Sequence, residues 1–282
     1  MKRTLIALVL AAALPLAALA DEPMSREFKL PLQEAPFAKG SVDGAANAWA
    51  GAFAAMVQKT NGVTIKAAAE FDKEREVRFL DTPGNCTLRA GGYILRERVI
   101  RQDYRLTLKT RSKDEAWVRA TSIDAPGAAT KLEEDVSPPA DGKLSRAATL
   151  RLVPRQAPKT LAQAAELFPA LKTMAAADAP LQVVEGLRVR EVVYQLPSWK
   201  VGGTKIEPGL ALWYDAKDGK LLFVEADFSY DVPQDPGRAR ELADKAQALF
   251  AAMQADSAWA GARSQTKTDF TYTAAGGKFC QQ

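Results

Sequence analysis

Several segments of this 282-residue chain carry charged residues of one sign at every second position. The basic sets are Arg96 with Arg98, Arg105 with Lys109 and Arg111, and Arg188 with Arg190; the acidic sets are Glu133 with Asp135 and Glu225 with Asp227. In an extended strand, residues i and i+2 point to the same side, so each set lines one face. If such faces enclose a passage, its ligand is a phosphate chain, because arginine and lysine neutralise phosphoryl oxygens while carboxylates hold a bridging divalent cation.

The same alternation also fits solvated outer faces whose charges form surface salt bridges, each worth about 0 to 1 kcal/mol. Alternation alone favours this second interpretation. The tunnel and the solvated-face interpretations predict different positions for the basic side chains. A tunnel requires the side chains of Lys29, Arg96, Lys109 and Arg188 to converge on one cavity.

The chain has no histidine. This excludes Ser-His and Cys-His catalytic groups as well as zinc or haem held by histidine. Carboxylates remain as the only good ligands for a metal. The residues assign no catalytic nucleophile.

Residues 1–20 read MKRTLIALVLAAALPLAALA, with two basic residues before an apolar run that ends in small residues. This pattern is typical of a secretory signal peptide, so we expect a periplasmic or secreted protein without a membrane span after cleavage. Removal of residues 1–20 lowers Lys+Arg from 38 to 36 against 34 Asp+Glu, a net charge of +2. Global charge therefore indicates no nucleic-acid partner.

The remaining residues, 21–282, are expected to form one α+β domain dominated by antiparallel sheet, because strand blocks alternate with helices. Period-two segments predict strands near 25–32, 77–79, 94–99, 103–111, 116–123, 131–136, 182–196, 211–215 and 221–230. Helices are expected from Asp43 to Asn61, over 158–176 and from Asp235 onward, with loops at 124–130 and 137–144.

Cys86 and Cys280 are the two cysteines. An exported compartment would allow them to pair, and two unpaired thiols are the alternative. A bridge would pin the C-terminal tail to the mouth of a barrel.

The segment that begins with Asp81-Thr82-Pro83 and continues through GYILRER (92–98) and RLTLKT (105–110) resembles the CYTH domain of the triphosphate tunnel metalloenzymes. That family has a DTP turn followed by LRxR and LTLK strands. Its opening ExExK strand is similar to residues 25–29, where Ser25 replaces the first glutamate. The later acidic and basic sets match in spacing, and Lys267 resembles a C-terminal Ser-Lys element. The resemblance covers about residues 25–270.

The resemblance implies an eight-stranded antiparallel β-barrel, a tunnel with helices packed outside. It implies phosphate binding by Lys29, Arg96, Arg98, Lys109, Arg188 and Arg190. It further implies that Mg²⁺ or Mn²⁺ is held by Glu27, Glu225 and Asp227, with Glu133 and Asp135 as further candidates.

Three functional hypotheses stay open. The first is a metal-dependent phosphoanhydride hydrolase, and the second is a tunnel that binds polyanions without turnover, because Ser25 removes one carboxylate from the metal-binding strand. The third and weaker hypothesis is a barrel that carries an apolar ligand. Cavities for such ligands are mostly apolar, so strand faces that carry charges of one sign count against it. Export favours inorganic polyphosphate, triphosphate or another small phosphorylated ligand over nucleoside triphosphates.

Overall fold

The computed structural model describes residues 24–152, 157–174, 178–263 and 265–281. The segment 1–20, for which the sequence predicts a signal peptide, lies outside this range. Among the described residues, no helix has the length and apolar character needed to cross a membrane.

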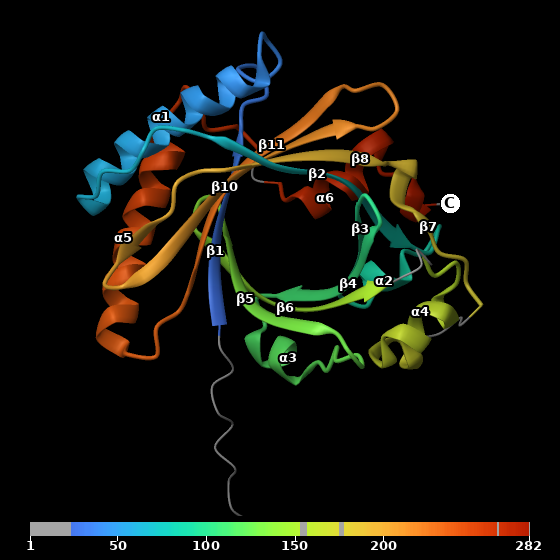
Figure 1. Ribbon diagram of the computed structural model, residues 1–282. Coiled ribbons are helices and arrows are strands. Elements are labelled where there is room, and N and C mark those ends of the chain that lie inside the picture. The colour runs from blue at the N-terminus through green and yellow to red at the C-terminus, as the bar shows by residue number, and fades with distance from the viewer. Residues whose placement is uncertain (1–23, 153–156, 175–177, 264, 282) are drawn as a thin grey trace, which may run out of the picture.

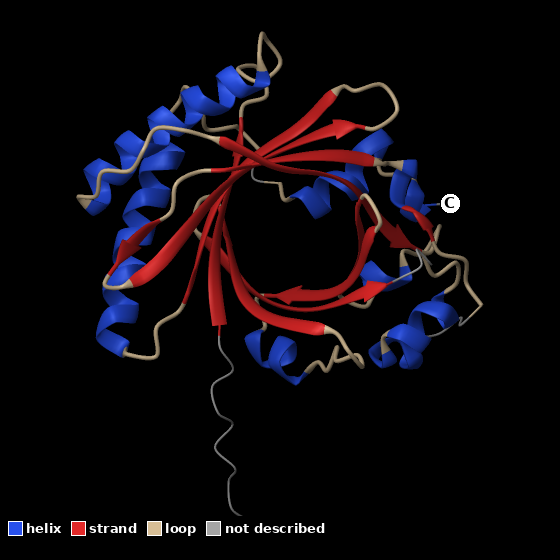
Figure 2. Ribbon diagram, viewed as in Figure 1, coloured by secondary structure: helices blue, strands red, loops and turns tan. Residues whose placement is uncertain are grey.

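Nine strands form a closed barrel (Figure 1) with helices around its outside (Figure 2). In ring order they are β11 (Leu221–Asp231), β1 (Met24–Leu32), β5 (Ala129–Ser137), β6 (Asp141–Leu152), β4 (Asp103–Ser112), β3 (Tyr93–Ile100), β2 (Glu70–Asp81), β8 (Val189–Gln195) and β10 (Thr204–Asp215), which pairs again with β11. Two short strands lie beside the ring, β7 (Gln182–Val183) on β2 and β9 (Trp199–Val201) on β10.

The barrel implied by the resemblance is therefore confirmed, with two differences in detail. The ring has nine strands rather than eight. The pair β1–β5 is parallel, whereas the other ring pairs are antiparallel.

The helices are α1 (Val42–Asn61), α2 (Thr87–Ala90), α3 (Glu115–Ala120), α4 (Leu161–Leu167), α5 (Pro236–Ala255) and α6 (Lys267–Thr273), with 3-10 turns η1 (Pro169–Thr173), η2 (Val184–Gly186), η3 (Ala274–Gly276) and η4 (Phe279–Gln281). Helix α1 begins after Ser41, whose hydroxyl accepts a hydrogen bond from the Gly44 N–H, and ends at Gly62 with φ 72°. Helix α5 begins with Pro236 after the cap Asp235. Both of these helices were predicted from the sequence.

The two largest hydrophobic clusters lie outside the barrel, between the strands and the helices. In β4, Tyr104, Leu106 and Leu108 are fully buried and pack with residues of α4, while Thr107 and Lys109 face the interior. On the opposite side, α1 and α5 cover β1 and β11, where the rings of Phe28 and Phe228 stack 4.8 Å apart. Because the apolar face of each strand packs outward, the polar face is left to line the interior.

Two predicted elements are wrong. The segment 116–123 is not a strand, because Asp114 caps helix α3 by accepting a hydrogen bond from the Trp117 N–H. The predicted loop 137–144 overlaps β6, which begins at Asp141 and pairs with both β4 and β5. Pro138 and Pro139 before the strand, and Gly142 within it, are typical of loops, so the sequence pattern did not indicate a strand here.

A charge-sorted tunnel as the candidate functional site

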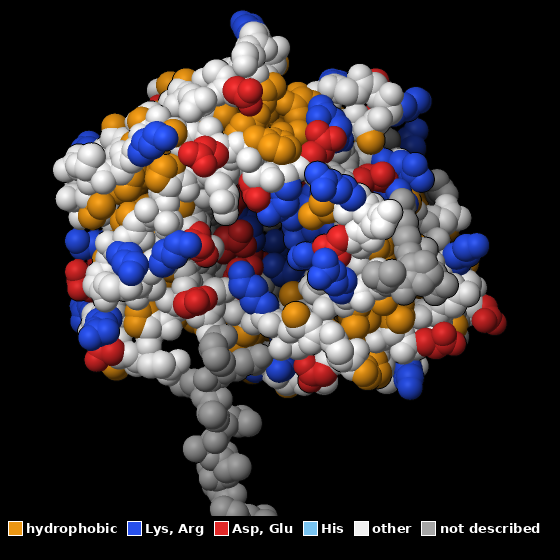
Figure 3. All heavy atoms as spheres, in the orientation of Figure 1, with side chains coloured by type: hydrophobic (Ala, Val, Ile, Leu, Met, Phe, Trp, Pro, Cys, Tyr) orange, Lys and Arg blue, Asp and Glu red, His pale blue; other side chains and the backbone are white. Residues whose placement is uncertain are grey.

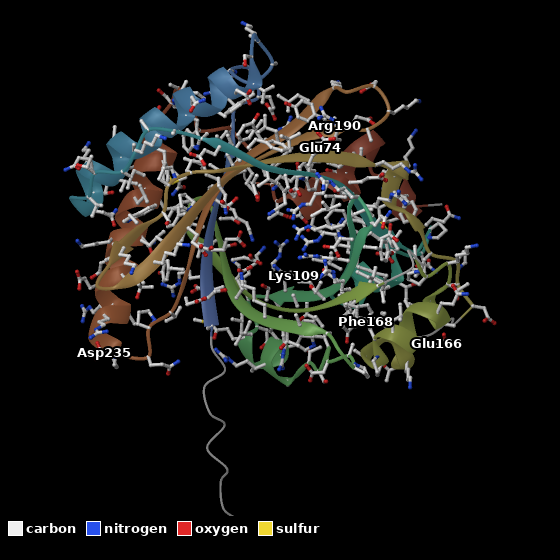
Figure 4. All side chains as sticks on the ribbon, in the orientation of Figure 1. Glu74, Lys109, Glu166, Phe168, Arg190 and Asp235 are labelled. Carbon is white, nitrogen blue, oxygen red and sulfur yellow. A yellow bond between two sulfur atoms is a disulfide. The ribbon has the colours of Figure 1, made fainter. Side chains whose placement is uncertain are left out.

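The barrel interior is a cavity of about 490 Å³, lined by all nine ring strands and by residues 266–268. Figure 3 shows this hollow with basic side chains on one side and acidic ones on the other. Lys29, Arg96 and Lys109 line the cavity, whereas Arg188 does not. Figure 4 shows Lys109 pointing into the barrel interior. These strands therefore enclose their charges, and the solvated-face interpretation does not apply to them.

Five basic residues form one side, which we call the cationic wall. They are Arg75 of β2, Arg96 and Arg98 of β3, and Lys109 and Arg111 of β4. Strand alternation positions them. In β3, Leu95 and Glu97 are buried on the outer face, so Arg96 and Arg98 at the alternate positions point inward.

Arg96 and Arg98 differ from the rest of the cationic wall. No described atom accepts a hydrogen bond from the buried Nε of either residue, and neither has an ion-pair partner among the described residues. Burial lowers the pKa of Arg96, and the charge of Arg75 lowers it further. Burial, together with the charge of Arg96, lowers the pKa of Arg98 well below its usual value. An unpaired buried cation is costly, so these two guanidinium groups are the place in the tunnel where an anion gains most.

Five carboxylates form the opposite side, which we call the acidic wall. They are Glu27 of β1, Glu133 and Asp135 of β5, and Glu225 and Asp227 of β11. Strand β1 lies between the other two, so Glu27 stands opposite Asp135 on one side and Lys29 opposite Asp227 on the other.

One group on the acidic wall has the composition of a metal site. Carboxylate oxygens of Glu27, Glu133 and Asp135 lie within 4.8 Å of one another. Hard cations such as Mg²⁺ and Mn²⁺ prefer such oxygen ligands, so these three residues fit the expected metal. The other two predicted ligands, Glu225 and Asp227, are on β11 and are not members of this group.

Lysine side chains contact the same carboxylates. Lys29 Nζ lies 2.6 Å from Glu27 and also contacts Asp135, and Lys109 Nζ lies 2.7 Å from Asp135. Burial by itself lowers the pKa of Lys29, but Asp135 and Glu27 outweigh burial and raise this pKa well above its usual value. Burial likewise acts to raise the pKa of Glu27, but Lys29 outweighs it and lowers the pKa to about 2. A metal ion would therefore compete with two lysines for its ligands.

Ser25, the departure from the ExExK strand, lies at the edge of this group. Its hydroxyl donates a hydrogen bond to Glu133 at 3.2 Å, and Lys131 also contacts Glu133. A hydroxyl is a weaker ligand than a carboxylate for a hard cation. The serine thus helps to hold a metal-ligand candidate in place without adding a charge.

The remaining carboxylates meet a lysine from the C-terminal helix. Lys267 Nζ lies 2.9 Å from Glu225 and 3.4 Å from Glu191. Burial, reinforced by the charge of Glu27, raises the pKa of Asp227 to about 7. Asp227 is therefore partly protonated near neutral pH.

The predicted inward placement of Arg188 and Arg190 is wrong. Arg190 donates to Glu74 at 3.0 Å and lies over the ring of Tyr214, on the outer surface (Figure 4), and Arg188 is exposed. The inward face of β8 instead carries Glu191, which is 1% exposed. A register difference of one residue moves every side chain of a strand to the other face.

Among the charged tunnel residues that were not predicted from the sequence are Arg75, Lys131 and Glu191. Arg75 contacts Glu191 across the β2–β8 pair. Strand β2 begins at Glu70, well before the strand predicted near 77, so Arg75 was not assigned to a face. The period-two spacing of Arg75 with Val77, and of Lys131 with Glu133, was the available signal.

The C-terminal segment packs against the Asp81-Thr82-Pro83 turn. Cys86 and Cys280 form a disulfide with their Cα atoms 5.2 Å apart, as the sequence predicted. Tyr272 Oη donates a hydrogen bond to Asp81 at 2.7 Å. These links place α6, and with it Lys267, at one end of the tunnel.

Neither a protein-family model nor a curated protein sequence matches the chain. Among solved structures it is similar to a Hippeastrum protein described as a candidate adenylyl cyclase with a dominant triphosphatase activity, with 14% identity, TM-score 0.42 and coverage of 88% of this chain and 94% of that one. It is also similar to candidate adenylate cyclases from Bacillus halodurans (10% identity, TM-score 0.36, coverage 86% and 93%) and Vibrio parahaemolyticus (17%, 0.29, 79% and 87%). At these values the likeness establishes no activity for this chain, and the fold rests on the strand pairing described above.

Proposed function

We propose that the tunnel binds a phosphate-chain anion such as triphosphate or inorganic polyphosphate. The observation that carries this proposal is the pair Arg96 and Arg98, two inward guanidinium groups whose buried Nε atoms have no described partner. An anion that accepts their hydrogen bonds would offset the cost of burying them.

A chain of phosphates fits better than a single anion, because the cationic wall extends over three neighbouring strands from Arg75 to Arg111. Each phosphoryl group along a chain can meet another cation of this wall. The charged lining also opposes an apolar ligand, since burying charges against apolar groups is unfavourable.

We further propose hydrolysis with Mg²⁺ or Mn²⁺ as a second function of the same tunnel. Glu27, Glu133 and Asp135 would hold the ion. When bound, the ion polarises a phosphoryl oxygen for attack by water. The part of this chain is to bind and orient the phosphates and to stabilise the developing negative charge with the cationic wall.

We also propose, from residues 1–20, that the protein works outside the cytoplasm. Inorganic phosphate chains or other phosphorylated metabolites would then be more available to it than nucleoside triphosphates.

Calorimetric titration with triphosphate, in the presence of a chelator, tests binding without catalysis. We expect Arg96→Ala to weaken binding by about tenfold or more, since a hydrogen bond to a charged group is worth roughly 1.5 to 3 kcal/mol. Arg188→Ala is the matched control, because this arginine lies outside the tunnel; its affinity should equal that of the unmodified protein. Equal affinities for all three proteins, or no binding at all, would exclude the tunnel as the anion site.

Release of phosphate from triphosphate and polyphosphate, with Mg²⁺ or Mn²⁺ added, tests hydrolysis separately. We expect release that Glu133→Gln abolishes while triphosphate binding without metal persists. Binding without any metal-dependent release would leave the polyanion-binding function and overturn the hydrolase.

A further inference from the structure

One carboxylate of the tunnel interior belongs to neither wall described above. Glu191 of β8 lines the cavity and is 1% exposed. In the strand register it stands opposite Arg75 of β2 on one side and opposite Trp213 of β10 on the other. The next inward residue of β8 is Val193. Strand β8 therefore presents an acidic and an apolar side chain to the cavity, beside the strands that carry the cationic wall.

Three donors hold the Glu191 carboxylate, and both of its oxygens are engaged. The Arg75 guanidinium contacts one oxygen through Nε. The other oxygen accepts a hydrogen bond from Trp213 Nε1–H at 2.8 Å and lies 3.4 Å from Lys267 Nζ. Burial by itself raises the pKa of Glu191, but Lys267 and Arg75 outweigh burial and lower this pKa well below its usual value. Glu191 is therefore a fixed negative charge at neutral pH.

The pairing of Glu191 reduces the number of cations that an incoming anion can use. Arg75 is a member of the cationic wall, but its charge is already offset by Glu191. Lys267 contacts Glu191 and a carboxylate of the acidic wall as well. By contrast, the buried Nε atoms of Arg96 and Arg98 have no hydrogen-bond partner among the described residues.

A phosphoryl group could take over Arg75 or Lys267 only by displacing Glu191. Displacement is unfavourable, because the buried carboxylate would lose the donors that compensate its burial. The carboxylate is also held in the interior, since every residue of β8 is paired with β10 and with β2. A phosphoryl group beside the intact Glu191 would meet a like charge in a medium of low dielectric constant. An anion therefore gains contacts on β3 and β4, and none along β8.

Building on the proposed function, we propose that Glu191 is a specificity-determining residue that restricts the ligand to a short phosphate chain, pyrophosphate or triphosphate. Its carboxylate is a built-in anion that occupies Arg75 and Lys267. A short chain finds its partners at Arg96, Arg98 and the neighbouring cations of β4. Each further phosphoryl group of a longer chain adds a negative charge that the tunnel does not offset.

The test compares linear chains of different length, pyrophosphate, triphosphate and linear hexaphosphate, by calorimetric titration with a chelator present. With the unmodified protein, hexaphosphate should bind no more tightly than triphosphate. Glu191→Gln keeps an oxygen that accepts hydrogen bonds but removes the charge. In this variant the hexaphosphate affinity should rise by about tenfold relative to the pyrophosphate affinity, the factor expected for one charge-assisted hydrogen bond. A purely structural role of Glu191 would change both affinities together and leave their ratio unaltered.

Glu74→Gln is the matched control, because it removes the same charge from the outer surface, where Glu74 pairs with Arg190. Its ratio of hexaphosphate to pyrophosphate affinity should equal that of the unmodified protein. An unchanged ratio in Glu191→Gln, or the same rise in both variants, would overturn the role of Glu191 while the proposed function stands. If the unmodified protein binds neither pyrophosphate nor triphosphate, the proposed function falls, and the role of Glu191 with it.

Arg75→Met tests the same pairing from the cation side and decides the matter if Glu191→Gln does not fold. Because Arg75 is already paired, its loss should weaken triphosphate binding by much less than the loss of about tenfold expected for Arg96→Ala. A loss of affinity in Arg75→Met as large as that in Arg96→Ala would show that Arg75 contacts the ligand, and the restriction by Glu191 would then be wrong.

Discussion

The charges on the two walls of the tunnel are paired to different extents. On the acidic wall, Lys29 contacts Glu27 and Asp135, and Lys267 contacts Glu225, so positive and negative charges compensate one another. On the cationic wall, Arg96 and Arg98 face the same cavity without a described partner. Charge alone therefore does not identify the candidate site. The anion site that we propose lies on the wall whose arginines lack described partners, whereas the ion pairs of the other wall connect different strands of the barrel.

The largest effect is expected from Asp135→Ala on the acidic wall. Asp135 is 2% exposed and contacts both Lys29 and Lys109, so its removal leaves two buried cations without their main partner. We expect a loss of about 3 to 5 kcal/mol in the free energy of unfolding, measured by urea denaturation. Asp141→Ala, which removes an exposed carboxylate paired with Lys113 at 2.7 Å, is the control and should leave the free energy of unfolding nearly unchanged, because surface ion pairs contribute little. If the two variants lose equal stability, the acidic wall is not a structural element.

The double variant Arg96→Leu/Arg98→Leu tests the cationic wall, and its two effects have opposite signs. Triphosphate affinity should fall by about a hundredfold or more, because two charge-assisted contacts are lost. Thermal stability without ligand should rise or stay unchanged, since replacing unpaired buried charges by apolar groups is often stabilising. A large loss of stability in calorimetry would show that the two arginines are structural.

Asp227→Asn tests the pH dependence of the acidic wall. The pKa of Asp227 is about 7 in the folded protein against an ordinary 3.8, so the folded state binds more protons than the unfolded state between these values. Stability from this group is present at lower pH and is lost as the pH rises toward 7. The asparagine variant lacks this loss, so it should be more stable than the unmodified protein at about pH 8 by on the order of 4 kcal/mol, with the difference vanishing near about pH 4. A constant difference across urea denaturations at several pH values would contradict the assignment.

Ser25→Glu is expected to have the smallest effect and would make the acidic wall more like that of the resembled family. A fourth carboxylate beside Glu27, Glu133 and Asp135 should raise Mn²⁺ affinity by about tenfold, as measured by titration calorimetry. Ser25→Ala, the control, removes the hydrogen bond to Glu133 without adding a ligand and should not raise the affinity. If both variants bind Mn²⁺ like the unmodified protein, the group around Glu27 is not the metal site.

The cationic wall was accessible to sequence reasoning because its strands have a regular pattern. In RLTLKT the leucines alternate with Thr107 and Lys109, so the apolar outer core fixes which residues point inward. Strand β8 lacks this signal, because apolar residues occupy both faces in Val192, Val193 and Tyr194. Its inward face is set by pairing with β2 and β10, which are far away in the sequence. The placement of Arg188 and Arg190 could not be deduced without that pairing.

The contacts between charged residues of different elements could not be predicted from the sequence either. Residues 132–136 carry three acidic side chains in a row, and only the parallel pairing with β1 brings Glu133 and Asp135 to Glu27. The position of Lys267 depends on the anchoring of α6 at the turn after β2. The period-two pattern therefore predicted that the tunnel is lined by basic and acidic residues. The pairing of strands that are distant in the sequence determines which of these charges contact one another.

The position of β1 in the ring has a consequence for how the protein folds. This first strand closes the barrel against β11, with Ser25 opposite Asp231, so the ring closes only when residues some 200 positions apart have met. Pairings over such sequence separations slow folding. A growing chain that has emerged only as far as β8 has all five residues of the cationic wall but no enclosed interior. The binding cavity therefore forms late, in the same event that completes the fold, and a partly made chain would hold its arginines open to solvent.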